Sequence, residues 1–136
     1  MMNMKKFLLA SLATFFVYEA LTHIMQILIF GSLHVISATL GDLIWAFIFV
    51  LIFIKGYQGK GWIEGLWFGL MIGILFSSGI LFGYIPGLTN MVVTFGTGTR
   101  WCSWLPLTTA ILWFLLNTLK IMICGVLTAI IYKPVK

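Results

Sequence analysis

Charged residues are scarce in this chain, and the scarcity limits what kind of protein it can be. Only 8% of the 136 residues are charged, whereas 62% are hydrophobic. Soluble domains carry about 25% charged residues, so we expect a protein surrounded by lipid rather than water. The expectation is one membrane domain over residues 1–136, which leaves no room for a soluble catalytic domain.

Cysteines and catalytic motifs are equally scarce. Cys102 and Cys124 would lie about 33 Å apart along one helix, too far for a disulfide. No Cys/His cluster indicates a metal or other cofactor, and no nucleophile–base pair, phosphate loop or zinc-protease motif is present. We therefore expect no catalytic residues, no metal and no enzymatic activity. The net charge of +5 does not indicate nucleic acid, because the basic residues occur singly or in pairs.

Long apolar runs are what the chain does contain, and they predict an all-α, four-helix transmembrane bundle. A helix needs about 20 apolar residues to cross the hydrocarbon core. The runs place spans at approximately 7–30, 36–54, 62–84 and 105–132. The polar, glycine-rich segment KGYQGKG separates the second span from the third, and YIPG follows the third.

The lysines predict how the bundle is oriented. If the four spans alternate in direction, one face carries Lys5, Lys6, Lys55, Lys60, Lys133 and Lys136. The opposite face carries only Arg100. Since basic residues concentrate on the cytoplasmic side, we expect a bacterial inner-membrane protein with both termini in the cytoplasm. Its surroundings would be the lipid bilayer.

Polar residues interrupt the first and fourth spans at a similar depth. Glu19 lies about 18 Å from Phe7, and Lys120 lies about 16–17 Å from Ile131. A lone charge near the middle of a membrane is costly and normally pairs with another. We therefore predict an intramembrane ion pair between Glu19 and Lys120.

Further polar residues extend this predicted cluster. His23 and Gln26 share a helix face with Glu19, because they follow it at i+4 and i+7. Asn117 precedes Lys120 by three residues and falls at the level of His23. The cluster serves either as a structural link between helices or as a site for protons or cations.

Asp42 and Ser77 are additional candidates for the cluster. Ser77, in the third span, falls at a similar level. Asp42 has two placements: a second helix beginning near Val35 puts it about 18 Å from Ile54, whereas a later start makes it a cap near the outer surface. In the first case Asp42 competes for Lys120, and in the second it can pair with Arg100.

A stripe of small residues runs along the third span. Gly65, Gly69, Gly73 and Ser77 recur every four residues, a pattern that lets another helix approach closely. The partner is either a helix of the same chain or one of a second chain, in a homo-oligomer or a membrane complex.

The run KGYQGKGWIEGLWFGLMIGIL and the basic tail IIYKPVK resemble a group of small four-span bacterial membrane proteins. In that group a polar pair ending in histidine occurs in the first helix, as Glu19 and His23 do here. The resemblance implies the four-span fold but no activity. Glu19 is also similar in kind and depth to the membrane glutamate of small multidrug-resistance transporters. The chain departs from them in its one-sided charge, in Lys120 and in the sequence around the glutamate.

Two functions follow from these patterns. The first is a non-enzymatic accessory protein or subunit of a membrane assembly, held together by the Glu19–Lys120 pair. The alternative is a small proton-coupled transporter that uses Glu19 and His23. They differ in one respect: the transporter needs a Glu19 that exchanges protons, whereas the structural pair keeps Glu19 charged.

Overall fold

The computed structural model describes residues 3–30, 39–82 and 107–132, and within them the chain is entirely helical apart from one short turn. The helices are α1 (Met4–Phe30), α2 (Thr39–Gly56), α3 (Trp62–Phe82) and α5 (Leu107–Tyr132). They coincide with the four predicted spans to within a few residues. The predictions for Arg100, Lys133 and Lys136 concern residues outside the described ranges, as do all predictions for residues 1–2, 31–38, 83–106 and 133–136.

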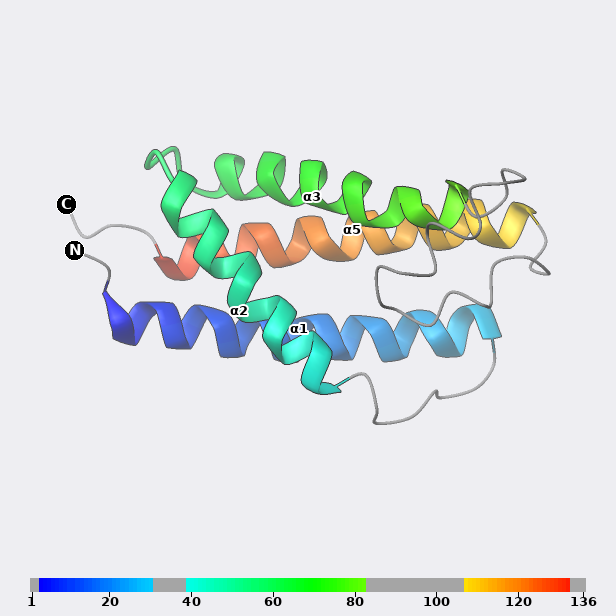
Figure 1. Ribbon diagram of the computed structural model, residues 1–136, viewed down its shortest axis with the longest axis horizontal. Helices are drawn as coiled ribbons and strands as arrows, with labels where there is room; N and C mark the ends of the chain where they lie inside the picture. Colours follow the sequence, from blue (N-terminus) through cyan, green and yellow to red (C-terminus); the bar gives the residue numbers. More distant parts are fainter. Residues whose placement is uncertain (1–2, 31–38, 83–106, 133–136) are drawn as a thin grey trace.

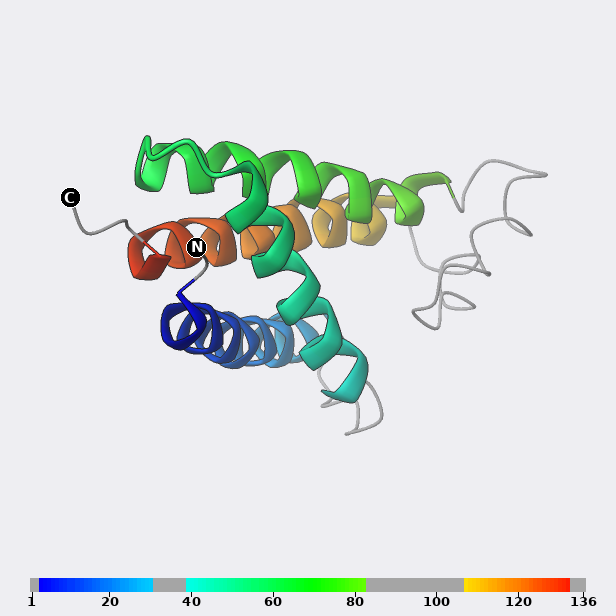
Figure 2. The same ribbon diagram turned by 60° about the vertical axis from the view of Figure 1, so that its left-hand side comes forward.

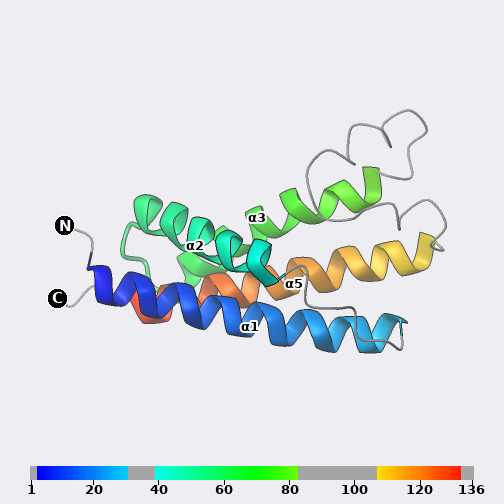
Figure 3. The ribbon, with the colours of Figure 1, turned by 60° about the horizontal axis from the view of Figure 1, so that its bottom comes forward.

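Helix α5 is the central element of the arrangement. It contacts α1, α2 and α3, and it runs alongside α3 in Figures 1 and 2. Helix α2 crosses the bundle obliquely, from the beginning of α3 to the middle of α1 (Figures 1 and 3). The start of α1, the end of α5 and the α2–α3 turn lie at the same end (Figure 1). Lys5, Lys6, Lys55 and Lys60 therefore share that end.

The α2–α3 turn is tight and is fastened by Glu64. Gly59 and Gly61 have φ of +86° and +77°, values that glycine adopts without a steric penalty. The Glu64 carboxylate, in the first turn of α3, accepts hydrogen bonds from the backbone N–H groups of Gln58 and Lys60. These bonds cap the start of α3, so the motif KGYQGKG forms a fixed connection.

The small-residue stripe of α3 packs against α5 within the same chain. A Cβ added to Gly69 would lie 2.7 Å from the carbonyl oxygen of Ile121, and one added to Gly73 would lie 3.0 Å from that of Thr118. Gly65 faces Gly125, and a Cβ on either would overlap the other's backbone. Of the two uses predicted for the stripe, the structure shows the intramolecular one.

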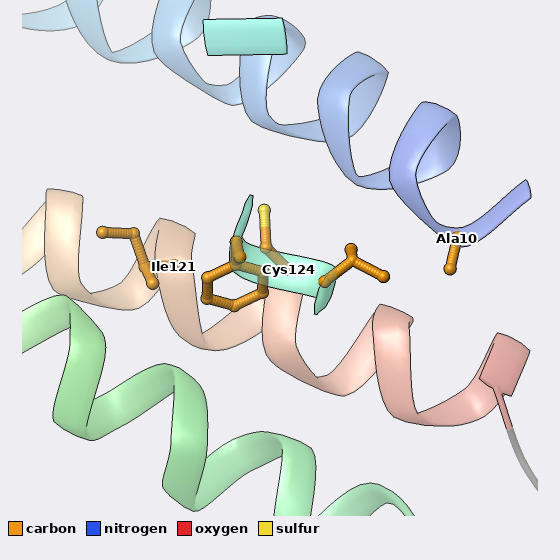
Figure 4. Close-up of a cluster of buried hydrophobic side chains, with 5 residues drawn as sticks. Ala10, Ile121 and Cys124 are labelled. Atoms are coloured by element: carbon orange, nitrogen blue, oxygen red, sulfur yellow. The ribbon is translucent and has the colours of Figure 1, made fainter. Parts of the chain in front are cut away.

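A small apolar core fills the space between α1, α2 and α5. It comprises Ala10, Phe49, Val50, Ile121 and Cys124, and Figure 4 shows the contribution of α5 facing α1. Most large apolar side chains nevertheless point outward, among them Trp67, Met71 and Leu75 of α3. Two helices, α1 over Met4–Ile29 and α5, are long and apolar enough to cross a membrane.

Candidate functional site

The Lys120 side chain is the buried cation of the bundle, and it is held by α1. Only 4% of the residue is exposed. Its Nζ donates a hydrogen bond to Thr22 Oγ1 over 3.0 Å and lies 3.7 Å from the centroid of the Tyr18 ring. Thr22 Oγ1 in turn donates to the Tyr18 carbonyl oxygen. Lys120 therefore meets α1 on either side of Glu19, at the level along α1 where the sequence places it.

The partner of Lys120 differs from the predicted one. Within the described residues, Lys120 forms its close contacts with Thr22 and Tyr18 rather than with Glu19, although the charge of Glu19 still acts on it at longer range. The reason is rotational. Successive residues of a helix are turned by about 100°, so Tyr18 and Thr22 face α5 while Glu19 is directed to the neighbouring face.

Glu19 is partly enclosed, and its nearest base lies on its own helix. Its side chain is 16% exposed, and Oε2 lies 3.6 Å from Nδ1 of His23, whose side chain is 46% exposed. The same Nδ1 lies 2.7 Å from the Glu19 carbonyl oxygen. A carbonyl only accepts, so Nδ1 carries a hydrogen. Glu19 Oε1 is buried without a hydrogen-bond partner in the described structure.

Asp42 lies beside Glu19 and completes a pair of carboxyl groups. The two side chains are close enough for the charge of Glu19 to act on Asp42, and the charges of Lys120 and His23 also act on Asp42. Helix α2 begins at Thr39, so Asp42 is in its first turn. It still reaches the cluster because the oblique path of α2 brings this turn to the middle of α1 (Figures 1 and 3). The sequence offered two alternatives, a late start of the second helix or a location of Asp42 close to Lys120. In the structure α2 begins at Thr39, and Asp42 nevertheless lies close enough for the charge of Lys120 to act on it.

Asn117 and Gln26 are placed differently from this pair. Asn117 Nδ2 donates to Ser77 Oγ over 2.9 Å, so Asn117 and Ser77 join α5 to α3 rather than to His23. Gln26 is half-buried on α1 and has an interaction partner. The predicted cluster is thus divided between two sides of α5.

Hydroxyl groups that the sequence prediction missed line the α1–α5 interface. Thr14 Oγ1 and Thr128 Oγ1 are hydrogen-bonded at 3.0 Å, and both residues are fully buried. Thr14, Tyr18 and Thr22 are spaced four residues apart, which places them on one helix face. This four-residue spacing of hydroxyl-bearing residues is the signal in the sequence that indicates such a face.

The site comprises Glu19 and Asp42, with His23 at its edge and Lys120 behind Tyr18. Two adjacent carboxyl groups can hold and release a proton. In a low-dielectric setting, the gain or loss of that proton determines the local charge. Among residues 3–30, 39–82 and 107–132, no three His, Cys, Asp or Glu side chains are grouped to hold a metal ion. Comparison with protein-family models, with curated proteins and with solved structures gave no match.

Proposed function

We propose that the chain is a bacterial inner-membrane protein whose helices α1, α2, α3 and α5 form four spans, with both termini in the cytoplasm. The length and apolar character of α1 and α5 support this proposal. The outward apolar side chains of α3 suit lipid contact. The lysines at one end, which include Lys5 and Lys55, favour a cytoplasmic location for that end.

We further propose that this protein is a small proton-coupled transporter in which Glu19 and Asp42 carry the proton. The observation that supports it most is the position of Glu19 beside Asp42 and His23, while Lys120 is held by Thr22 and Tyr18. A glutamate locked to a lysine would stay ionised. One that faces a second carboxyl group can exchange a proton, as proton relays in membranes require.

The test is proton movement in proteoliposomes that contain a trapped pH-sensitive dye. A panel of alkali-metal and organic cations is added outside, and proton flux is recorded for each one. We expect coupled flux with the parent and its loss in Glu19→Gln and in Asp42→Asn. The matched control is Glu64→Gln, the same change at the α2–α3 turn, which retains an acceptor oxygen and should retain flux. Flux that persists in both cluster variants, or that never occurs in the parent, would rule out the transporter.

An accessory subunit of a membrane assembly is the second candidate function. It is favoured by the outward stripe of Trp67, Met71 and Leu75, which lies opposite the glycine stripe of α3 and is more than half exposed at each residue. A partner helix could cover this stripe. Gentle extraction into nanodiscs followed by mass measurement distinguishes the two candidates, because a subunit leaves the membrane with other chains and a self-sufficient transporter does not require them.

A further inference from the structure

A groove lies between α2 and α3, near the turn that joins them. The two helices leave this turn in different directions (Figure 1), so side chains rather than backbone border the space between them. The groove has a volume of about 260 Å³ and is lined by Phe53, Gly56, Glu64, Trp67, Phe68 and Met71. It includes neither Glu19 nor Asp42, so the proposed proton site does not account for it.

The walls of the groove are apolar along most of its length. The Phe53 side chain is buried, and its ring lies edge-on to that of Phe68, with the centroids 5.2 Å apart. Trp67 and Met71 border the groove from α3 and are mostly exposed. A flexible hydrocarbon chain can follow such a surface. A partner helix fits it less well, because membrane helices approach one another over small residues and these side chains are large.

The end of the groove near the turn is polar. Glu64 lies there, and its carboxylate already accepts hydrogen bonds from the backbone N–H groups of Gln58 and Lys60. The Lys60 side chain is exposed and forms no ion pair with another described residue. Lys55, which precedes Gly56 on the other side, is also exposed. Two lysines against one carboxylate give this end a net positive charge.

The polar end and the apolar walls lie at different depths in the proposed membrane orientation. Trp62 is exposed at the start of α3, and exposed indole rings are typical of the headgroup level. From Glu64 to Met71, α3 rises by about 10 Å. The groove therefore leads from the headgroups into the hydrocarbon, and an occupant that suits both parts joins an anionic group to an apolar chain.

We propose that this groove binds one anionic phospholipid, with an acyl chain against Phe68 and Met71 and the phosphate at Lys60. Basic residues beside spanning helices attract anionic lipids, and a lysine can lay its apolar stem along the protein while its ammonium group meets a headgroup. The inference rests on the proposed membrane location but not on proton transport. A bound lipid would fill the space between α3 and α2, the helix that carries Asp42.

The headgroup preference is measured by native mass spectrometry of the full chain, released from nanodiscs that contain equal amounts of phosphatidylglycerol and phosphatidylcholine. The parent is expected to retain phosphatidylglycerol in preference. Lys60→Gln should lower its retention about fivefold, the effect of one lysine near an anionic lipid surface. The matched control is Lys5→Gln, the same change at an exposed lysine of α1 at the same end of the bundle, which should retain the lipid.

The location of the acyl chain is tested by filling the groove. Met71 and Leu75 lie one helical turn apart and are 67% and 66% exposed, but only Met71 lines the groove. Met71→Trp should abolish the preference for phosphatidylglycerol, whereas Leu75→Trp should keep it. Circular dichroism of each variant checks that the helices are retained.

Equal retention of the two lipids by the parent overturns the inference. So does a preference that Lys60→Gln and Met71→Trp leave unchanged, or one that Lys5→Gln weakens as much as Lys60→Gln does. A second protein chain that is retained in place of lipid and lost in Met71→Trp would assign the groove to a protein partner instead. If the chain stays in solution without lipid or detergent, the proposed membrane location fails and the inference fails with it. Absence of proton flux, in contrast, contradicts the transporter alone.

Discussion

The two sides of α5 are built in different ways. Toward α3, the interface depends on shape: Gly65, Gly69 and Gly73 let the helices meet backbone to backbone. Toward α1, it depends on hydroxyl groups and a charge: Thr14 bonds Thr128, and Lys120 bonds Thr22. A close-packed interface has few ways to rearrange. In a polar interface, the gain or loss of a single proton changes the interaction energy between the helices. The difference suggests that α3 and α5 form the rigid half and that α1 and α2 hold the responsive site.

The largest effect is expected from filling the glycine stripe. In Gly69→Leu the new side chain meets the backbone of Ile121 and Met122, so the helices must separate, at a cost of about 3 kcal/mol. Gly56→Ala is the control, because nothing lies within 4 Å of an added Cβ there. Denaturation in detergent measures both. A Gly69→Leu protein as stable as the control would contradict the described α3–α5 contact.

A smaller effect is expected from removing the buried cation. Lys120→Met leaves two carboxyl groups without their counter-charge and should destabilise the bundle by about 2 kcal/mol at neutral pH. At acidic pH the loss should shrink, since protonated carboxyl groups no longer need a cation. Stability is measured at both pH values, with Lys55→Met, at the exposed end of α2, as the control. A loss independent of pH would mean that Lys120 acts mainly by packing against Tyr18.

The smallest effect is expected where the rigid half contains a polar contact. Ser77→Ala removes the hydroxyl that accepts from Asn117, and hydrogen bonds between membrane helices contribute only about 0.6 kcal/mol on average. A double-mutant cycle with Asn117→Leu isolates the coupling between the two side chains. A coupling as large as the loss in Lys120→Met would remove the distinction drawn between the two sides of α5.

The helices and the glycine stripe were predictable from the sequence because both depend on spacing along one chain. Four apolar runs gave α1, α2, α3 and α5, and a four-residue repeat gave the packing face of α3. Depth was predictable too, since the rise per residue is constant, and this is why Lys120 was placed at the level of Glu19.

The direction in which a side chain points toward other helices was not predictable in the same way. Counting residues gives the level of a side chain along its helix but not the rotation of α1 relative to α5. The sequence therefore predicts that Glu19 pairs with Lys120, whereas Tyr18 and Thr22 occupy the face of α1 that Lys120 contacts. The tilt of α2 is likewise a product of packing. Asp42 lies in the first turn of α2 and reaches the middle of α1 only because α2 is tilted. The sequence does not show this tilt.

The central position of α5 has a consequence for biosynthesis. The chain is made from its N-terminus, and α5 ends at Tyr132, 50 residues after α3 ends at Phe82. At about 5–20 residues per second, ribosomes need roughly 3–10 s for that interval. During it, the glycine stripe of α3 and the hydroxyl face of α1 have been synthesised while the helix that covers them has not. Both surfaces are therefore open to chaperones, insertases or wrong partners, and assembly of the bundle is timed by the arrival of its last helix.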